Sequence, residues 1–160
     1  MKLRKKSWQE KLADSRGLPR VCPIDAAKSK RWGTGTFVIP APMEVDQLMR
    51  QVPRGRVTTI DELRKVLARR HGATIACPLT TGIFSWIAAR AAAEAESEGK
   101  MKTTPFWRTL KSNGELNPKY PGGTAGLAQR LSDEGHKILQ KGKRFFVEGF
   151  KDHLATFKEV

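Results

Sequence analysis

The residues that could do chemistry gather in one short stretch, Pro105-Phe106-Trp107-Arg108, and in the loop Tyr120-Pro121-Gly122-Gly123 that follows it. The stretch places two aromatic rings beside a permanently charged guanidinium. Aromatic faces next to a fixed cation suit a flat, anionic partner such as a nucleotide. Because Phe and Trp are also common core residues, a buried aromatic segment followed by ordinary turns is the alternative interpretation.

A second candidate for chemistry is Cys77, which precedes Pro78 at a predicted helix N-terminus. The helix dipole can depress a thiol pKa there, so Cys77 could act as a nucleophile. The alternative is a small packing residue, since Ala76 and Leu79 beside it are apolar. The other cysteine, Cys22, is far away in the sequence, and the two fit no metal-ligand spacing. We therefore predict free thiols, no metal site and no cofactor.

Two consecutive helices are predicted upstream of the aromatic stretch. Thr59 is the expected N-cap of the first, with Glu62 completing a capping box, and the second begins at Pro78 and ends near Gly99. Two helices joined by a short Gly-containing turn resemble a helix-turn-helix. The second helix has small residues at its expected exposed start, where N-terminal amides favour the phosphates of a DNA backbone. These small residues are Thr80, Thr81, Gly82 and Ser85.

Shorter elements complete the predicted fold. Periodicity favours a strand over 33–40, helices over 43–52 and 124–132, and a short terminal helix over about 150–157. Between residues 136 and 147 it favours a β-hairpin that turns at Lys141-Gly142, with a basic tip that could act as a wing over a phosphate backbone. The cations that we expect at a DNA surface are Arg54, Arg56, Arg90, Lys141 and Lys143.

Charge is the strongest global feature of the chain. The 160 residues include 30 Lys and Arg against 16 Asp and Glu, for a net charge of +14. Residues 1–33 form a basic arm with ten cations, Lys2 among them, and three acids. A field of this sign attracts polyanions, and double-stranded DNA is the partner that we expect. A basic tail that only aids solubility is the alternative.

The hydrophobic content of 39% is enough for a core. The sequence has no apolar run near the ~20 residues that a membrane span needs, and no apolar region of a signal peptide follows the basic start. We therefore expect no membrane partner, and a monomer in the cytoplasm that associates with the nucleoid.

Four segments, taken in order, carry a resemblance to a known family. Residues 52–59, 83–88, 105–108 and a last piece made of 120–123 with 131–135 resemble the DNA-binding, active-site domain of O6-alkylguanine-DNA alkyltransferases and their alkyltransferase-like relatives. Pro105-Phe106-Trp107-Arg108 stands where that family has its Pro-Cys-His-Arg motif. Residues 52–59 match the approach to the first helix of the helix-turn-helix, 83–88 the recognition helix, and 120–123 the substrate loop.

The resemblance implies an α+β, mainly helical fold: a winged helix-turn-helix-like alkyltransferase C-terminal domain with a small β-hairpin and a basic N-terminal extension. It divides the chain into the extension 1–42, the DNA-binding domain 43–135, and a hairpin with a short helix, 136–160, packed on that domain. The pocket for a base would be lined by Phe106, Trp107, Arg108, Tyr120, Gly122 and Gly123.

This chain departs from the family at the residues that perform the reaction. Phe106 stands at the alkyl-accepting Cys, and Trp107 at the His that activates the thiol. Glu134 matches the acidic end of that relay but has no relay to serve. Because accepting an alkyl group needs a thiolate, which a phenyl ring cannot supply, transfer at this position is chemically excluded. In alkyltransferase-like proteins the same position is aromatic, and those proteins bind alkylated bases without repairing them.

Two DNA-handling residues also differ from the family pattern. Ile60 stands where the family has a Tyr that helps to rotate the nucleotide, and Thr81 falls near its intercalating Arg. Rotating a base out of the stack costs a few kcal/mol, which a wedge side chain normally offsets. Arg90 and Arg108 are candidates for that part.

Three functions remain open from the sequence. The first is a non-enzymatic DNA-binding protein that recognises O6-alkylguanine and, as the resemblance implies, passes the lesion to nucleotide-excision repair. The second is a general DNA-binding or regulatory protein without lesion recognition, which the losses at Ile60 and Thr81 favour. The third is an enzyme that uses Cys77 as a relocated nucleophile, or Asp133 or Glu134 in base excision.

Overall fold

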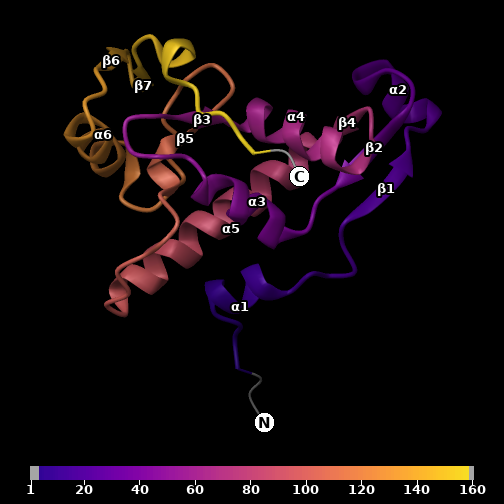
Figure 1. Cartoon of the computed structure of the whole chain (residues 1–160), viewed down its shortest axis with the longest axis horizontal. Helices are drawn as coiled ribbons and strands as arrows, with labels where there is room; N and C mark the ends of the chain where they lie inside the picture. Colours follow the sequence, from indigo (N-terminus) through magenta and orange to yellow (C-terminus); the bar gives the residue numbers. More distant parts are fainter. Residues whose placement is uncertain (1–3, 159–160) are drawn as a thin grey trace.

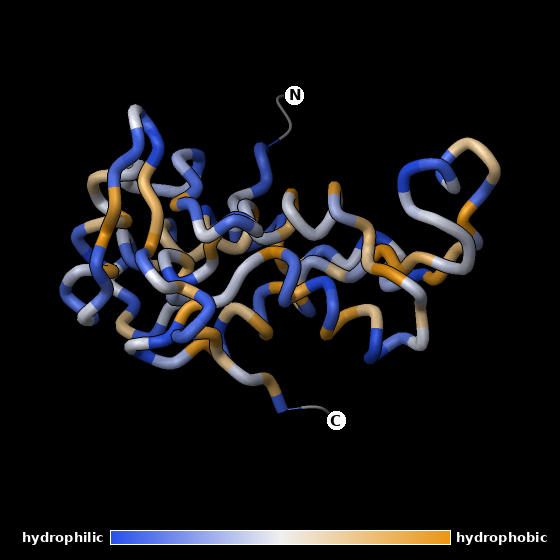
Figure 2. The backbone as a smooth tube through the Cα atoms, turned by 90° about the horizontal axis from the view of Figure 1, so that it is seen from above, coloured by the Kyte–Doolittle hydropathy of each residue, from blue (hydrophilic) through white to orange (hydrophobic). Residues whose placement is uncertain are grey.

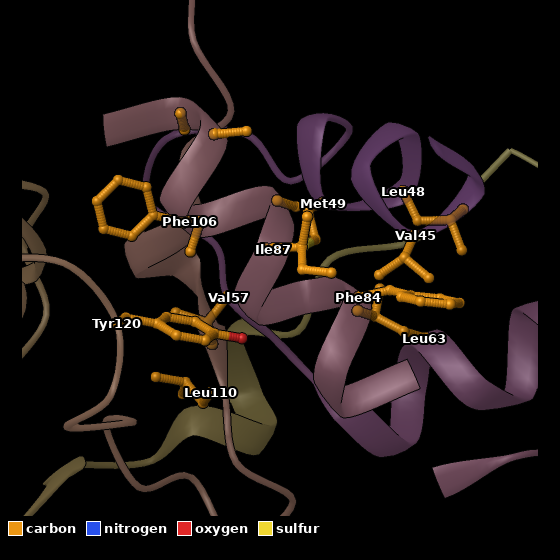
Figure 3. Packing of buried hydrophobic residues seen from close by; sticks show 14 of the residues in the cluster. Val45, Leu48, Met49, Val57, Leu63, Phe84, Ile87, Phe106, Leu110 and Tyr120 are labelled. Atoms are coloured by element: carbon orange, nitrogen blue, oxygen red, sulfur yellow. The ribbon is translucent and has the colours of Figure 1, made fainter. Parts of the chain in front are cut away.

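The long helix α5 (Pro78–Ser97) crosses the middle of the molecule, as the computed structural model of residues 4–158 shows (Figure 1). Pro78 occupies its first turn, as predicted, where a missing N–H costs nothing. Three helices, α1 (Trp8–Ala13), α3 (Pro42–Arg50) and α4 (Ile60–His71), pack against it. Their apolar faces meet in one cluster that includes Leu48, Leu63 and Ile87 (Figure 3). The predicted α+β, mainly helical fold class is confirmed.

Three small sheets join segments that are distant in sequence. In the first, β1 (Arg20–Pro23) pairs antiparallel with β2 (Thr36–Ile39), which pairs parallel with β4 (Ile75–Ala76). In the second, β3 (Thr58–Thr59) pairs parallel with β5 (Thr109–Leu110). The third is the predicted hairpin of β6 (Ile138–Lys141) and β7 (Arg144–Val147). The second sheet matters most here, because it fixes the aromatic stretch beside the start of α4.

The helix-turn-helix elements form where the sequence predicts them. The hydroxyl of Thr59 accepts a hydrogen bond from the Glu62 backbone N–H at 3.2 Å, so the predicted N-cap of α4 is confirmed. The reciprocal half of the capping box is wrong, since the Glu62 carboxylate accepts from Lys65 Nζ at 3.2 Å instead. Gly72 ends α4 in the left-handed region, and β4 lies between the two helices.

The N-terminal extension folds back on α5. Ser7 and Glu10 form a capping box at the start of α1, and the Trp8 ring meets Trp86 of α5 edge to face at 4.9 Å. The Glu94 carboxylate on α5 accepts hydrogen bonds from the backbone N–H groups of Trp8 and Gln9. Two further elements of the extension, β1 and α2 (Ala26–Trp32), were not predicted, because segments of four to seven residues are too short to show a clear periodicity. Lys2 lies outside the described residues.

The C-terminal part begins with α6 (Gly123–Asp133), which confirms the predicted helix there. The register of the hairpin pairs Lys141 with Arg144, so its turn is Gly142-Lys143 rather than Lys141-Gly142. The hairpin lies at the end of the molecule away from α2 and β1 in both overall views (Figures 1 and 2), and its use as a wing stays a prediction.

The predicted terminal helix is wrong in length. A 3-10 helix, Phe150–His153, is followed by extended chain. Val57 is the reason: its N–H donates to His153 O at 2.9 Å and its carbonyl accepts from Ala155 N at 2.8 Å. These two bonds hold the segment in a bridge beside the start of the helix-turn-helix.

Candidate nucleic-acid interface

The aromatic stretch is held in a tight turn between α5 and β5. Thr104, just before it, donates a hydrogen bond of 2.6 Å to the buried carboxylate of Asp46 on α3, which also accepts from Arg50. Residues Phe106–Arg108 then form a 3-10 helix, closed by a bond from Arg108 N to Pro105 O at 3.1 Å. The turn is therefore anchored on both sides, by α3 before it and by the β3–β5 pair after it.

Phe106 and Tyr120, two predicted walls of the base pocket, are core residues. They are 1% and 3% exposed, and their rings meet edge to face at 6.3 Å in the same cluster as Leu110 (Figure 3). The Tyr120 hydroxyl donates to Ser85 Oγ on α5 at 3.0 Å, and burial raises the pKa of Tyr120 to about 12. Their predicted place on an open pocket wall is wrong for this conformation. The alternative from the sequence, a buried aromatic segment, describes Phe106.

Trp107 and Arg108 both engage Glu134 at the end of α6. Arg108 binds the carboxylate with two hydrogen bonds, of 2.8 and 2.7 Å, and Trp107 Nε1 donates to it at 3.0 Å. A third bond runs from Arg108 to the backbone oxygen of Val52 at 2.8 Å. Burial opposes ionisation of Glu134, but the hydrogen bonds from Arg108 and Trp107 outweigh it and hold the pKa of Glu134 below its ordinary value. Glu134, which the resemblance would place at the end of a relay, is held by Arg108 and Trp107 as a structural anchor.

Trp107 is the member of the predicted pocket that reaches the surface with a ring. Arg130 of α6 lies over it at 4.3 Å, and Arg108 at 5.3 Å. Gly122 and Gly123 lie at the start of α6, and Gly122 takes the left-handed conformation at its N-cap. The structure thus places Trp107, Arg108 and the Phe106 backbone in one turn. Gly122 and Gly123 lie at the N-terminus of α6, the helix that packs against this turn.

The predicted phosphate-contacting residues at the start of α5 divide between two faces. Thr81 and Ser85 are 0% and 1% exposed, with the Thr81 hydroxyl bonded to Cys77 O at 2.7 Å and the Ser85 hydroxyl to Gly82 O at 2.8 Å. Their side chains cannot reach a DNA backbone, so that prediction is wrong for both. Thr80 and Gly82 are partly exposed, but the Thr80 hydroxyl oxygen is itself buried and has no hydrogen-bond partner within the described residues. The prediction assigned Thr81 and Ser85 to the wrong face of α5. Their hydroxyls can be buried because each donates its hydrogen bond to a backbone carbonyl of the same helix or its N-cap.

The predicted cations do not form one patch. Arg54 and Arg56 are exposed, and each donates to a backbone oxygen, of Asp133 at 2.8 Å and of Asp152 at 3.4 Å. The Arg90 guanidinium lies near the rings of Trp8 and Trp86, with its Cζ 6.0 and 5.5 Å from their centroids. Arg90 and Arg108 are therefore both held in place and are poor wedge candidates. Lys141 and Lys143 are exposed on the hairpin, at the far end from α2 (Figure 1).

A stripe of apolar side chains on the outer face of α5 was missed. Leu79 and Ile83 are 69% and 42% exposed, one helical turn apart, and Trp86 continues the stripe one turn further on. They line a groove of about 440 Å³ together with Asn117 and Lys119. This stripe could have been predicted from the sequence. The first turns of the helix carry apolar residues on more than one face, and a single core can bury only one of those faces.

Cys77 lies where it was predicted, at the N-cap of α5. It is 7% exposed, and its backbone N–H donates to Val38 O at 2.9 Å. Cys22 lies on β1, and both thiols are free. Within residues 4–158, no group of three or more His, Cys, Asp or Glu side chains could hold a metal ion. No helix in this described part is long and apolar enough to cross a membrane.

His136 lies buried behind the Glu134 anchor. It is 8% exposed, and its ring meets that of His153 edge to face at 5.6 Å. Burial lowers the pKa of His136 below its ordinary value, with smaller contributions from His153 and Arg108, while Glu134 opposes the shift. The folded chain therefore favours the neutral imidazole.

This shift predicts a loss of stability on the acid side. Above about pH 6.5 the ring is neutral in both states, and below it the unfolded chain takes up the proton more readily. The free energy of unfolding should fall as the pH drops from about 6.5 to the folded-state pKa, by roughly 1.4 kcal/mol for each unit of depression. Thermal melts from pH 5 to 8 of the wild type and of His136→Gln test this. An equal slope in both proteins would contradict it.

Comparisons with known proteins give similarity at the level of fold. No protein-family model and no curated protein matches the chain. Among solved structures, S. pombe Atl1 in complex with damaged DNA containing O6-carboxymethylguanine is 20% identical, with a TM-score of 0.45. S. pombe ATL in complex with DNA is 18% identical, with a TM-score of 0.46. Each match covers 72% of this chain and 94% of the S. pombe chain.

Proposed function

We propose that this chain is a non-enzymatic DNA-binding protein of the alkyltransferase-like type. The observation that carries the proposal is the anchored turn at Phe106–Arg108, directly after a helix-turn-helix. It has a buried ring where the family has a thiol, and its acid is engaged by Arg108 and Trp107. A site with this arrangement would lack the thiol that alkyl transfer needs.

DNA binding is supported by the charge and by the helix pair. A net charge of +14 favours a polyanionic partner, and neutralising phosphates would supply most of the affinity. The outer face of α5 is open to solvent at Leu79 and Ile83, so this helix can face a duplex. Arg54 and Arg56, exposed in the turn before α4, lie on the same helix-turn-helix unit.

Recognition of O6-alkylguanine is part of the proposal. A rotated base would meet Trp107 first, and would reach Phe106 only if the loop carrying Tyr120 moved away from Ser85. That movement breaks the Tyr120–Ser85 hydrogen bond and the bond from Trp86 Nε1 to Lys119 O, at a cost of about 1–3 kcal/mol for each bond whose groups stay unpaired. Contacts to the alkyl group would offset this cost, and hand-over to nucleotide-excision repair proteins would follow binding.

A second candidate is general DNA binding without lesion recognition. The burial of Phe106 and Tyr120 favours it, since the closed conformation offers no open pocket between these two rings. In this case the helix-turn-helix would act alone, and alkylation of the DNA would not matter.

Binding to matched duplexes separates the two candidates. The purified chain should bind a duplex with one O6-methylguanine about tenfold or more tightly than the same duplex with guanine, at several salt concentrations. Mass spectrometry of the protein afterwards should detect no added methyl group. Equal affinity for both duplexes would leave the second candidate, and a methylated protein would overturn the non-enzymatic assignment.

A further inference from the structure

The surface on both sides of Leu79 has a composition that points to one kind of partner. One groove, of about 440 Å³, lies between the outer face of α5 and the 117–119 loop. A second, of about 390 Å³, lies between α5 and α2 of the N-terminal extension, lined by Trp32 and Phe37. Leu79 lines both grooves and forms the ridge between them.

The charged side chains around this ridge are all cations. Lys119 borders the first groove, and Lys28 and Arg31 of α2 border the second. No Asp or Glu lines either groove. Arg31 and Lys119 form no ion pair with any residue in 4–158, and Lys28 has only the exposed Asp25, at 3.5 Å. The ridge is thus apolar in the middle, with one cation on each side, Arg31 and Lys119, that is unpaired among the described residues.

We propose that α2 and the outer face of α5 form one duplex-binding surface, with Leu79 and Ile83 against base edges and Lys28, Arg31 and Lys119 on the flanking phosphates. The minor groove has a matching layout, since its base edges form a floor about 6 Å wide between two lines of phosphate. Apolar side chains inserted there unstack base steps and bend the duplex. Leu79 therefore supplies the wedge that Arg90 and Arg108, both held by other contacts, cannot.

The role of α2 lies outside the segments that resemble the alkyltransferases, since it belongs to the extension 1–42. The sheet β1–β2–β4 explains how it reaches the interface: β2 follows α2, and only the N-cap residue Cys77 separates β4 from α5. A protein partner or a second copy of this chain would also cover the apolar ridge. Such a protein surface would, however, need one acidic side chain opposite each of Lys28, Arg31 and Lys119. A duplex supplies phosphates on both sides without such a match.

The inference rests on the proposed function, and paired variants test it separately. Arg31→Glu should weaken binding to a plain duplex at least tenfold, whereas Lys30→Glu, the same charge change on the neighbouring residue of α2, should weaken it less than about threefold. Arg31→Ala should also lower the slope of log K against log salt by about 1. Equal losses in Arg31→Glu and Lys30→Glu would overturn the role of α2.

The wedge is tested on the ridge itself. Leu79→Ala should weaken binding about tenfold and abolish the fluorescence rise of a 2-aminopurine placed in the bound duplex. Met101→Ala, which truncates a side chain 94% exposed elsewhere, should change neither. If Leu79→Ala leaves both the fluorescence and the affinity unchanged, Leu79 is not a wedge. The same conclusion follows if sedimentation shows that Leu79→Ala changes only the self-association of the protein and not its DNA binding. If the wild type binds no duplex at all, the proposed function itself is wrong, and this result is distinct from a failure of the Leu79 and Arg31 variants to change binding.

Discussion

Replacing Arg108 by Ala is expected to destabilise the chain by about 3–5 kcal/mol. Only 14% of the Arg108 side chain and 4% of the Glu134 side chain are exposed, so the substitution leaves a carboxylate in a dry site. It also removes the bond from Arg108 to Val52 O, which ties the aromatic turn to the segment before the helix-turn-helix. Urea unfolding at pH 7, followed by tryptophan fluorescence, measures the change in the free energy of unfolding.

Two matched variants separate the anchor from general charge loss. Arg130→Ala also removes a guanidinium that lies over Trp107, but its ion pair with Glu96 is half-exposed and should contribute about 1 kcal/mol or less. Adding Glu134→Gln to Arg108→Ala should restore part of the lost stability, because the buried charge disappears while Trp107 keeps an acceptor. Equal losses for Arg108→Ala and Arg130→Ala would show that the anchor does not hold the turn.

The helices around this anchor could be predicted because local chemistry specifies them. Thr59 satisfies an N-terminal amide of α4, Pro78 opens α5, and the apolar residues of both helices repeat at the helical period. The hairpin β6–β7 follows in the same way from two short apolar runs on either side of a Gly-containing turn. These signals lie within a few residues of one another, so one sequence is enough to read them.

The faces of α5 could not be predicted, because they depend on partners far away in the sequence. The inner face is set by α1 and α3, which bury Phe84 and Ile87, and by the Tyr120 loop, which takes up Ser85. Without knowledge of those partners, the sequence does not show whether Thr81 or Leu79 faces the solvent. The structure turns Thr81 inward and Leu79 outward, and the interface moves with them.

The candidate site shows the same division between type and environment. The resemblance aligns Phe106 with an alkyl-accepting position, and a phenyl ring would exclude transfer there by its type alone. Whether the ring lines a pocket or fills the core depends on Tyr120, α5 and α6, which meet it only in three dimensions. Glu134 is the clearest case: its match to a catalytic relay was visible in the sequence, and its capture by Arg108 was not.

The substitution Phe106→Cys is expected to yield a protein that still transfers no alkyl group. The new thiol would lie at a position that is 1% exposed among apolar side chains, where burial raises a thiol pKa and little thiolate forms. Trp107 cannot take a proton from it, and Glu134 stays bound to Arg108. Loss of the ring should also cost about 2–4 kcal/mol, slightly less than a full truncation to Ala.

Adding Trp107→His to Phe106→Cys should change this outcome. An imidazole at that position can take over the hydrogen bond to Glu134 that Trp107 Nε1 makes at 3.0 Å, and can then accept the thiol proton. Incubation with an O6-methylguanine duplex and mass spectrometry of the intact protein should give a 14 Da adduct only in the double variant, on the order of one methyl group per molecule because the transfer consumes the thiol. An adduct on Phe106→Cys alone would mean that the turn still activates a thiol without a base. An adduct on the wild type that disappears in Cys77→Ser would place the chemistry at the start of α5 instead.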